Sequence, residues 1–168
     1  PSQPYVHGWH MDAIADHLTA VSRRQIRRLL INVPPGTMKS MATGVFWPAW
    51  EWGALNQPAM RFIGASHEEG LATRDAVRMR RLVQSDWFQE RWPLAMVGDQ
   101  NAKTYFENAS TGWRQSCPVR SMTGRRGDRV TWDDPHSVED AHSDARLEEA
   151  NRIFRETLPT RLNRPGLS

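Results

Sequence analysis

A lysine followed by a serine lies in a short loop between two segments of different character. The loop covers residues 34–40 (PPGTMKS), follows the apolar run 29–33, and precedes a helix-like run that starts at Met41. A turn from strand to helix directs backbone N–H groups and the positive end of the helix dipole to one place, where phosphate oxygens bind. Lys39 can pair with the β- and γ-phosphates, and the Ser40 hydroxyl can ligate Mg²⁺. The loop therefore predicts binding of a nucleoside triphosphate.

The loop departs from the usual pattern Gly-x-x-x-x-Gly-Lys-Ser/Thr at both glycines. Val33 and Met38 stand where that pattern has glycine, and Met38 permits a close backbone approach to phosphate less readily than glycine would. An ordinary strand-turn-helix connection has a similar composition, so both interpretations stay open on the loop alone. The predicted nucleotide-binding residues are Pro35, Gly36, Thr37, Met38, Lys39, Ser40 and Met41.

A second candidate element is the run 129–134 (RVTWDD), which has strand propensity and ends in two carboxylates before Pro135. In nucleotide-hydrolysing sheets, an acidic residue at the end of such a strand holds Mg²⁺ and a neighbouring carboxylate polarises the attacking water. We assign Asp133, with Ser40, to the metal and Asp134 to the water, although the reverse order is possible. Alone, Asp-Asp-Pro is more often a turn or a helix cap. Together with the loop, it favours an ATPase.

Four segments in combination resemble the large terminase subunit of tailed bacteriophages: residues 28–40, 46–53, 124–129 and 133–137. Their order and spacing match the family, and the resemblance extends over nearly the whole chain. It implies an α/β fold of the P-loop NTPase, additional-strand (ASCE) type, with a mainly parallel sheet flanked by helices. It also implies a motor that hydrolyses ATP with Mg²⁺ and drives double-stranded DNA through the portal of an empty procapsid.

The resemblance also implies partners and a domain organisation. The partners would be double-stranded DNA, the portal protein, the small terminase subunit and other large subunits in a ring, in the bacterial host cytoplasm. We expect residues 1–168 to form one N-terminal ATPase domain, a fragment that stops before the remaining core strands and the C-terminal nuclease domain. The sheet should then be incomplete, and catalysis by this piece alone is doubtful.

The activating arginine has no obvious position. Many members of the family have an arginine or a glycine inside the loop, where this chain has residues 36–38. Arg126, with its neighbour Arg125, lies in a glycine-flanked loop shortly before the acidic strand and is our candidate catalytic arginine. A neighbouring subunit could equally supply this group, and a solvated or DNA-facing loop explains the pair as well.

Composition is typical of one globular domain, with 39% hydrophobic and 24% charged residues in 168. No segment approaches the roughly 20 apolar residues that a membrane span requires, and none has the features of a signal peptide, so we expect a cytosolic protein without a membrane partner. Cys117 is the only cysteine, which excludes an internal disulfide and a thiolate metal cluster.

Periodicity and turn residues predict the elements that position these side chains. Helices are expected at 9–21, at 41–53 with a kink or an end at Pro48, at 67–84 with Ser66 as N-cap, and at 143–157 with Ser143 as N-cap. Strands are expected at 29–33, 60–65 and 129–134, and a hairpin joins 104–108 to 112–119.

Contact with DNA has the weakest support. A net charge of +3 and a pI near 9.6 favour a phosphate backbone, and arginines gather in two clusters, 23–28 and 74–81. Either cluster is also explained as a solvated surface. Two alternatives to a packaging ATPase therefore remain: another DNA-dependent P-loop ATPase such as a helicase, or a non-catalytic prophage remnant that binds nucleic acid.

Overall fold

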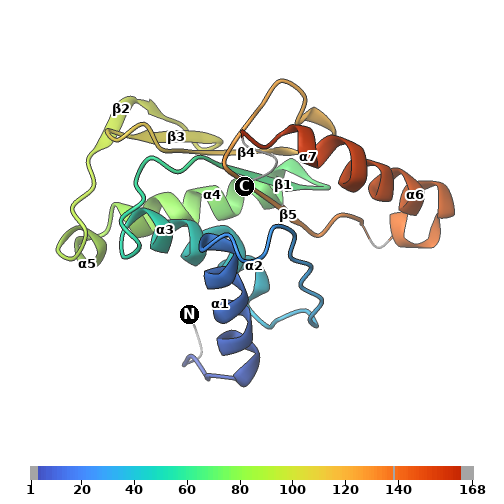
Figure 1. The fold of residues 1–168 in the computed structure, drawn as a ribbon, viewed down its shortest axis with the longest axis horizontal. Coiled ribbons are helices and arrows are strands. Elements are labelled where there is room, and N and C mark those ends of the chain that lie inside the picture. The colour runs from blue at the N-terminus through green and yellow to red at the C-terminus, as the bar shows by residue number, and fades with distance from the viewer. Residues whose placement is uncertain (1–3, 138, 164–168) are drawn as a thin grey trace.

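A five-stranded sheet lies at the centre of the computed structural model, which describes residues 4–137 and 139–163 (Figure 1). The strand order is β2 (Met96–Asn101), β3 (Tyr105–Asn108), β4 (Trp113–Pro118), β1 (Phe62–Ser66) and β5 (Arg129–Asp133). β1 pairs in parallel with both β4 and β5, whereas β2 with β3 and β3 with β4 are antiparallel. The predicted α/β class is confirmed, but the sheet is mixed rather than mainly parallel.

The antiparallel half of the sheet results from the hairpin that the sequence predicts. The fully buried Asn108 ends β3, and its Oδ1 accepts hydrogen bonds from the backbone N–H groups of Ser110 and Gly112. Gly112 is required because a Cβ there would lie 1.9 Å from the carbonyl oxygen of Pro58. The third antiparallel strand, β2, was not predicted, because its polar and largely exposed sequence lacks the alternation of a half-buried strand.

Helices cover both faces of the sheet. Phe62 of β1 packs with α3 (Trp47–Trp52) and α4 (Glu69–Val83) on one face. Ile63, the next residue, packs with Cys117 and Met122 on the opposite face, where the π-helical turn η4 (Ile153–Thr157) and α7 (Leu158–Thr160) add side chains. β1 is therefore buried on both sides, which explains its continuous run of apolar and small residues.

The predicted helices form, with some corrected boundaries. The remaining described helices are α1 (Trp9–Ser22), α2 (Lys39–Met41), the π-helical turn η1 (Ala42–Phe46), α5 (Asp86–Gln89), η2 (Val119–Ser121), η3 (Asp140–His142) and α6 (Asp144–Arg152). Pro48 neither ends nor interrupts the helical run, which continues from α2 through η1 to Trp52. A π-helical turn directly before proline relieves the clash between its ring and the preceding carbonyls. The Ser66 N-cap is wrong, because Ser66 ends β1 and α4 starts after Glu68.

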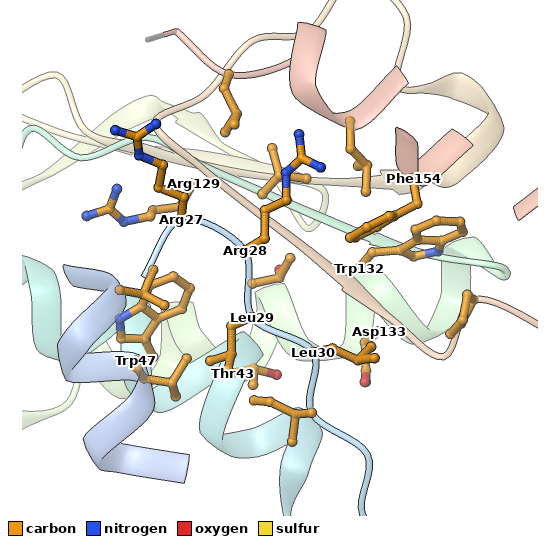
Figure 2. A pocket seen from close by; sticks show the side chains of 18 of the residues that line it. Arg27, Arg28, Leu29, Leu30, Thr43, Trp47, Arg129, Trp132, Asp133 and Phe154 are labelled. Atoms are coloured by element: carbon orange, nitrogen blue, oxygen red, sulfur yellow. The ribbon is translucent and has the colours of Figure 1, made fainter. Parts of the chain in front are cut away.

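The predicted strand at 29–33 is also wrong. This segment follows α1 as an extended chain, and none of its amides donates a hydrogen bond to a described residue. A strand is stabilised by pairing with a neighbour. The available neighbour would be the outer edge of β5, but a cavity of about 800 Å³ separates the two (Figure 2). Leu30 is consequently 87% exposed despite its apolar side chain.

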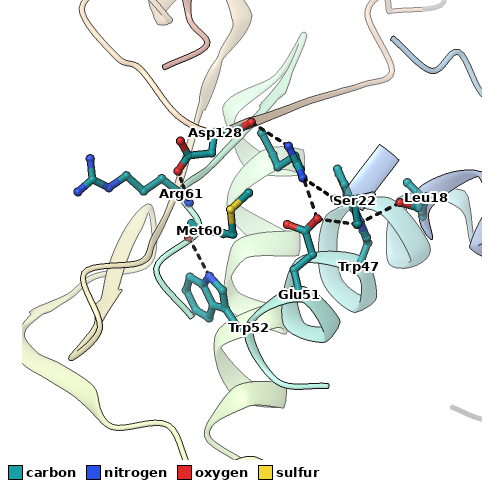
Figure 3. A network of polar contacts seen from close by, with 9 residues as sticks. Leu18, Ser22, Trp47, Glu51, Trp52, Met60, Arg61 and Asp128 are labelled. Atoms are coloured by element: carbon teal, nitrogen blue, oxygen red, sulfur yellow. Dashed lines mark hydrogen bonds and ion pairs between the residues drawn. The ribbon is translucent and has the colours of Figure 1, made fainter. Parts of the chain in front are cut away.

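A buried polar network fixes α1 and α3 against the start of β5 (Figure 3). The Nε of Arg129 donates to Oε1 of Glu51 at 3.3 Å, and the Ser22 hydroxyl donates to the same oxygen at 2.5 Å. Trp47 Nε1 in turn donates to Ser22 Oγ at 2.8 Å. Burial raises the pKa of Glu51, and the Arg129 charge and the Ser22 hydrogen bond oppose that shift. The network anchors the helical run that begins at Lys39.

Candidate functional site

Lys39 and the two carboxylates singled out from the sequence lie together. Lys39 begins the helical run, Asp133 is the last residue of β5, and Asp134 follows it. Lys39 Nζ is 3.1 Å from Asp133 Oδ1 and 2.8 Å from Asp134 Oδ1, across a separation of 95 residues in the second case. The fold thus brings the predicted phosphate-binding lysine and the predicted acidic pair into one site.

The charges of this cluster leave an excess of one negative unit. Burial alone would lower the pKa of Lys39, but the hydrogen bonds and charges of Asp134 and Asp133 outweigh it and raise that pKa. Lys39 is therefore a cation at neutral pH. Its side chain and that of Asp133 are only about one quarter exposed, at 24% and 22%. The two carboxylates share one ammonium group, and the charge of Arg74 also acts on both of them.

The loop before Lys39 has a left-handed backbone at Gly36 and at Met38, which stands where the usual pattern has its second glycine. Met38 has φ 62° and ψ 14°, in the left-handed region, and Gly36 has φ 82°. The Thr37 hydroxyl closes the turn by donating to the Pro34 carbonyl oxygen at 2.7 Å. A left-handed non-glycine residue costs on the order of 1–3 kcal/mol. The methionine therefore strains the loop without preventing the turn.

Oxygen-bearing side chains gather beside the lysine. Ser40, Asp133 and Ser66 line one small cavity of about 10 Å³, and Ser66 lies opposite Asp133 in the β1–β5 register. The Ser66 hydroxyl is buried and has no hydrogen-bond partner within the described residues. A hard cation that retains several waters needs only one or two carboxylates from the protein. Ser40 and Asp133 carry oxygen donors of the kind that Mg²⁺ takes, whereas residues 4–137 and 139–163 contain no group of three His, Cys, Asp or Glu side chains placed to hold a metal ion.

Arg114 of β4 lines the same small cavity and was missed by the sequence analysis. Arg114 is 2% exposed, and burial lowers its pKa to about 10, with the charge of Asp75 opposing the shift. It crosses the face of Gly64 in β1, where a Cβ would lie 2.1 Å from Nη2 of Arg114. A glycine inside a predicted central strand was the available signal, because it often marks a close approach of another group.

The larger cavity opens beside the same charged cluster. Figure 2 shows Arg27, Arg28, Leu29 and Leu30 on one side and Trp132 and Phe154 on the other. Lys39, Asp133 and Asp134 also line it, so the charged cluster is accessible from this space.

Arg126 is not brought to the site. Its Nη2 donates to the carbonyl oxygen of Leu162 at 3.1 Å, and Arg125 donates to the Ser121 carbonyl oxygen. Both residues precede β5, whereas Asp133 ends it, and a strand of this length spans about 13 Å. Within the described residues, Arg126 therefore lies at the opposite end of β5 from Lys39.

The arginines of α4 are partly engaged within the chain. Arg74 Nε donates to Asp75 Oδ1 at 2.9 Å, and Arg78 Nη1 lies 3.4 Å from the same oxygen. Arg80 Nη1 donates to the carbonyl and side-chain oxygens of Asn101 in β2. Arg74 and Arg78 remain near half exposed, so phosphate groups can reach them.

Comparison with protein-family models and with curated proteins finds no match for the chain. Among the described helices, none combines the length and apolar character needed to cross a bilayer.

Proposed function

We propose that this chain is the ATP-hydrolysing motor domain of a phage terminase large subunit, which packages double-stranded viral DNA into a procapsid. The observation that carries the proposal is the meeting of Lys39 with Asp133 and Asp134 at the end of a parallel strand. A lysine at a turn into a helix, facing acids at a strand end, is the arrangement in which P-loop ATPases bind MgATP. The P-loop, additional-strand type of the fold is part of this proposal.

Each residue then has a defined task. The backbone of residues 35–38 and the Lys39 ammonium hold the β- and γ-phosphates, and Ser40 and Asp133 would hold Mg²⁺. When bound, the metal neutralises charge on the phosphate oxygens. Asp134, 52% exposed and next to the open cavity, orients the attacking water and accepts its proton. The contacts with the portal, the small subunit, neighbouring large subunits in a ring and DNA, in the host cytoplasm, belong to the same proposal.

Binding of a fluorescent ATP analogue in the presence of Mg²⁺ tests the proposal directly. Lys39→Ala should weaken binding by about 10-fold to 100-fold, because it removes a charge-assisted hydrogen bond worth about 1.5–3 kcal/mol. Asp133→Ala should make the remaining affinity insensitive to Mg²⁺. Lys103→Ala is the matched control, since Lys103 is the only other lysine and is exposed after β2, at the far edge of the sheet.

The result also separates the alternatives. If the folded wild-type chain fails to bind, or if Lys39→Ala and Lys103→Ala bind equally well, the nucleotide site is refuted. A nucleic-acid-binding domain without nucleotide would then be the better hypothesis. Stimulation of hydrolysis by double-stranded but not by single-stranded DNA would distinguish a packaging motor from a helicase that acts on single strands.

A further inference from the structure

His67 makes two hydrogen bonds to the residue assigned to water activation. It follows the last residue of β1, and both its backbone N–H and its ring Nδ1 contact the carbonyl oxygen of Asp134, at 3.3 and 2.8 Å. A carbonyl oxygen only accepts hydrogen bonds, so the ring nitrogen must carry the proton. The bonds join the ends of β1 and β5 one residue beyond the ladder, which finishes at the pair Ser66 and Asp133.

The backbone of Asp134 requires such support. Its φ is 45°, in the left-handed region, and it directly precedes Pro135, which further restricts the residue before it. Residues other than glycine rarely adopt this conformation, which persists only where the surroundings hold it. The Asp134 side chain is half exposed, so packing does not hold it, and its one carboxylate contact among the described residues is with Lys39. The His67 hydrogen bonds therefore maintain the turn that directs this carboxylate toward Lys39.

We propose that His67 is a positioning residue that holds the Asp134 carboxylate in its orientation for the reaction. We call the two hydrogen bonds from His67 to the Asp134 carbonyl oxygen the clamp. The role of Asp134 in this inference rests on the proposed function, whereas the clamp rests on the hydrogen bonds alone. His67 acts through Asp134 and makes no contact with phosphate in this scheme. Its loss should therefore lower kcat and leave KM for MgATP nearly unchanged.

The clamp can be tested without turnover. In protein labelled with ¹³C and ¹⁵N, the His67 ring should show protonated Nδ1, and the Asp134 carboxyl ¹³C shift should report its pairing with Lys39. His67→Ala should move that shift, and His67→Asn should restore it, because the asparagine amide can donate from nearly the position of Nδ1. His67→Gln, whose amide reaches the position of Nε2 instead, should not restore it. This pair of variants remains informative if the alanine variant fails to fold.

His17→Ala is the matched control. His17 Nδ1 makes a 2.7 Å bond to the Ala13 carbonyl oxygen, the same kind of bond on an exposed helix surface, and its removal should leave the Asp134 shift unchanged. An Asp134 shift that is unaltered in His67→Ala, or a ring protonated only on Nε2, would overturn the clamp. Where hydrolysis is measurable, kcat in His67→Ala should fall by about 10-fold to 100-fold, as for a misplaced catalytic group.

Failure of the wild-type chain to bind MgATP would refute the proposed function instead, and the carboxyl shifts would still decide whether the clamp exists. An equal kcat in His67→Ala and wild type, with the carboxyl shift displaced, would overturn the catalytic role of the clamp.

Discussion

Removing the guanidinium of Arg129 should destabilise the protein strongly at pH 7 and weakly at pH 5. Glu51 is fully buried and Arg129 is 6% exposed, so each is the main counter-charge of the other. In Arg129→Met, Glu51 keeps only the hydrogen bond from Ser22 to Oε1, while Oε2 has no partner among the described residues. A buried carboxylate in that situation takes up a proton rather than stay charged.

The magnitude follows from the cost of that proton. Each pH unit above the ordinary pKa of 4.5 costs about 1.4 kcal/mol. At pH 7 the roughly 2.5 units set an upper bound of about 3.4 kcal/mol on the loss relative to wild type, because the pKa of Glu51 is already raised in the wild-type protein. At pH 5 the cost falls to about 0.7 kcal/mol. The packing that is lost with the arginine side chain destabilises the protein equally at pH 5 and pH 7.

The sign of the pH dependence is specific. Burial raises the pKa of Glu51 above its unfolded value, and Arg129 limits this shift. The contribution of a carboxyl group with a raised pKa is fully present below the unfolded pKa and is lost as the pH rises through the folded pKa. Arg129→Met should raise the folded pKa further and therefore steepen the loss of stability between pH 5 and pH 7.

Urea unfolding followed by far-UV circular dichroism at both pH values measures the effect. Glu51→Gln/Arg129→Met is the control, because it removes both charges, and its difference from Glu51→Gln should be the same at pH 5 and pH 7. If Arg129→Met lost equal stability at both pH values, the carboxylate would not be held charged by Arg129 and the reasoning would be refuted.

Three other substitutions or measurements test the packing and the loop. Gly64→Ala should lower the free energy of unfolding in urea by about 1–3 kcal/mol, because the new Cβ collides with Arg114. Gly98→Ala is the control and should be nearly neutral, since a Cβ there would have no heavy atom within 4 Å. Equal losses in the two variants would contradict the contact between Gly64 and Arg114. Amide hydrogen exchange at residues 29–33 should be fast while β1 stays protected, and slow exchange there would show that the segment is paired. Met38→Gly should raise the urea midpoint, with a gain of about 1 kcal/mol in the free energy of unfolding, because glycine relieves the left-handed strain. A lower midpoint would show that the methionine side chain stabilises the protein by more than the strain costs.

The sequence predicted the acidic strand, the hairpin and the long helices because their signals are local. Turn residues, apolar runs and helical spacing are properties of neighbouring residues, and the full burial of β1 agreed with its apolar run. The segment 29–33 has an equally good local pattern but did not become a strand, since a strand also needs a pairing partner. Propensity describes what a segment can form, and pairing decides whether it forms.

The sequence could predict those residues of the candidate site that begin a helix or end a strand. Lys39 and Asp133 were identified from their positions at the start of a helix and the end of a strand, and the fold brings them together. Ser66, His67 and Arg114 were missed because their roles depend on register and on the approach of another strand. No pattern in one segment contains that information. Gly64 marked a close contact without indicating that the contacting group is a buried guanidinium.

The charges of the site should make ATP binding depend on Mg²⁺. Lys39 now neutralises part of the charge on Asp133 and Asp134, and it can reach a triphosphate only by leaving them. Of the two ion pairs, the one with Asp134 is half exposed on the carboxylate side and contributes about 0–1 kcal/mol. The carboxylates left behind would repel the phosphates unless a divalent cation replaces the lysine. ATP should consequently bind much more weakly without Mg²⁺, and Asp133→Asn should reduce this dependence because it removes one of the repelling charges.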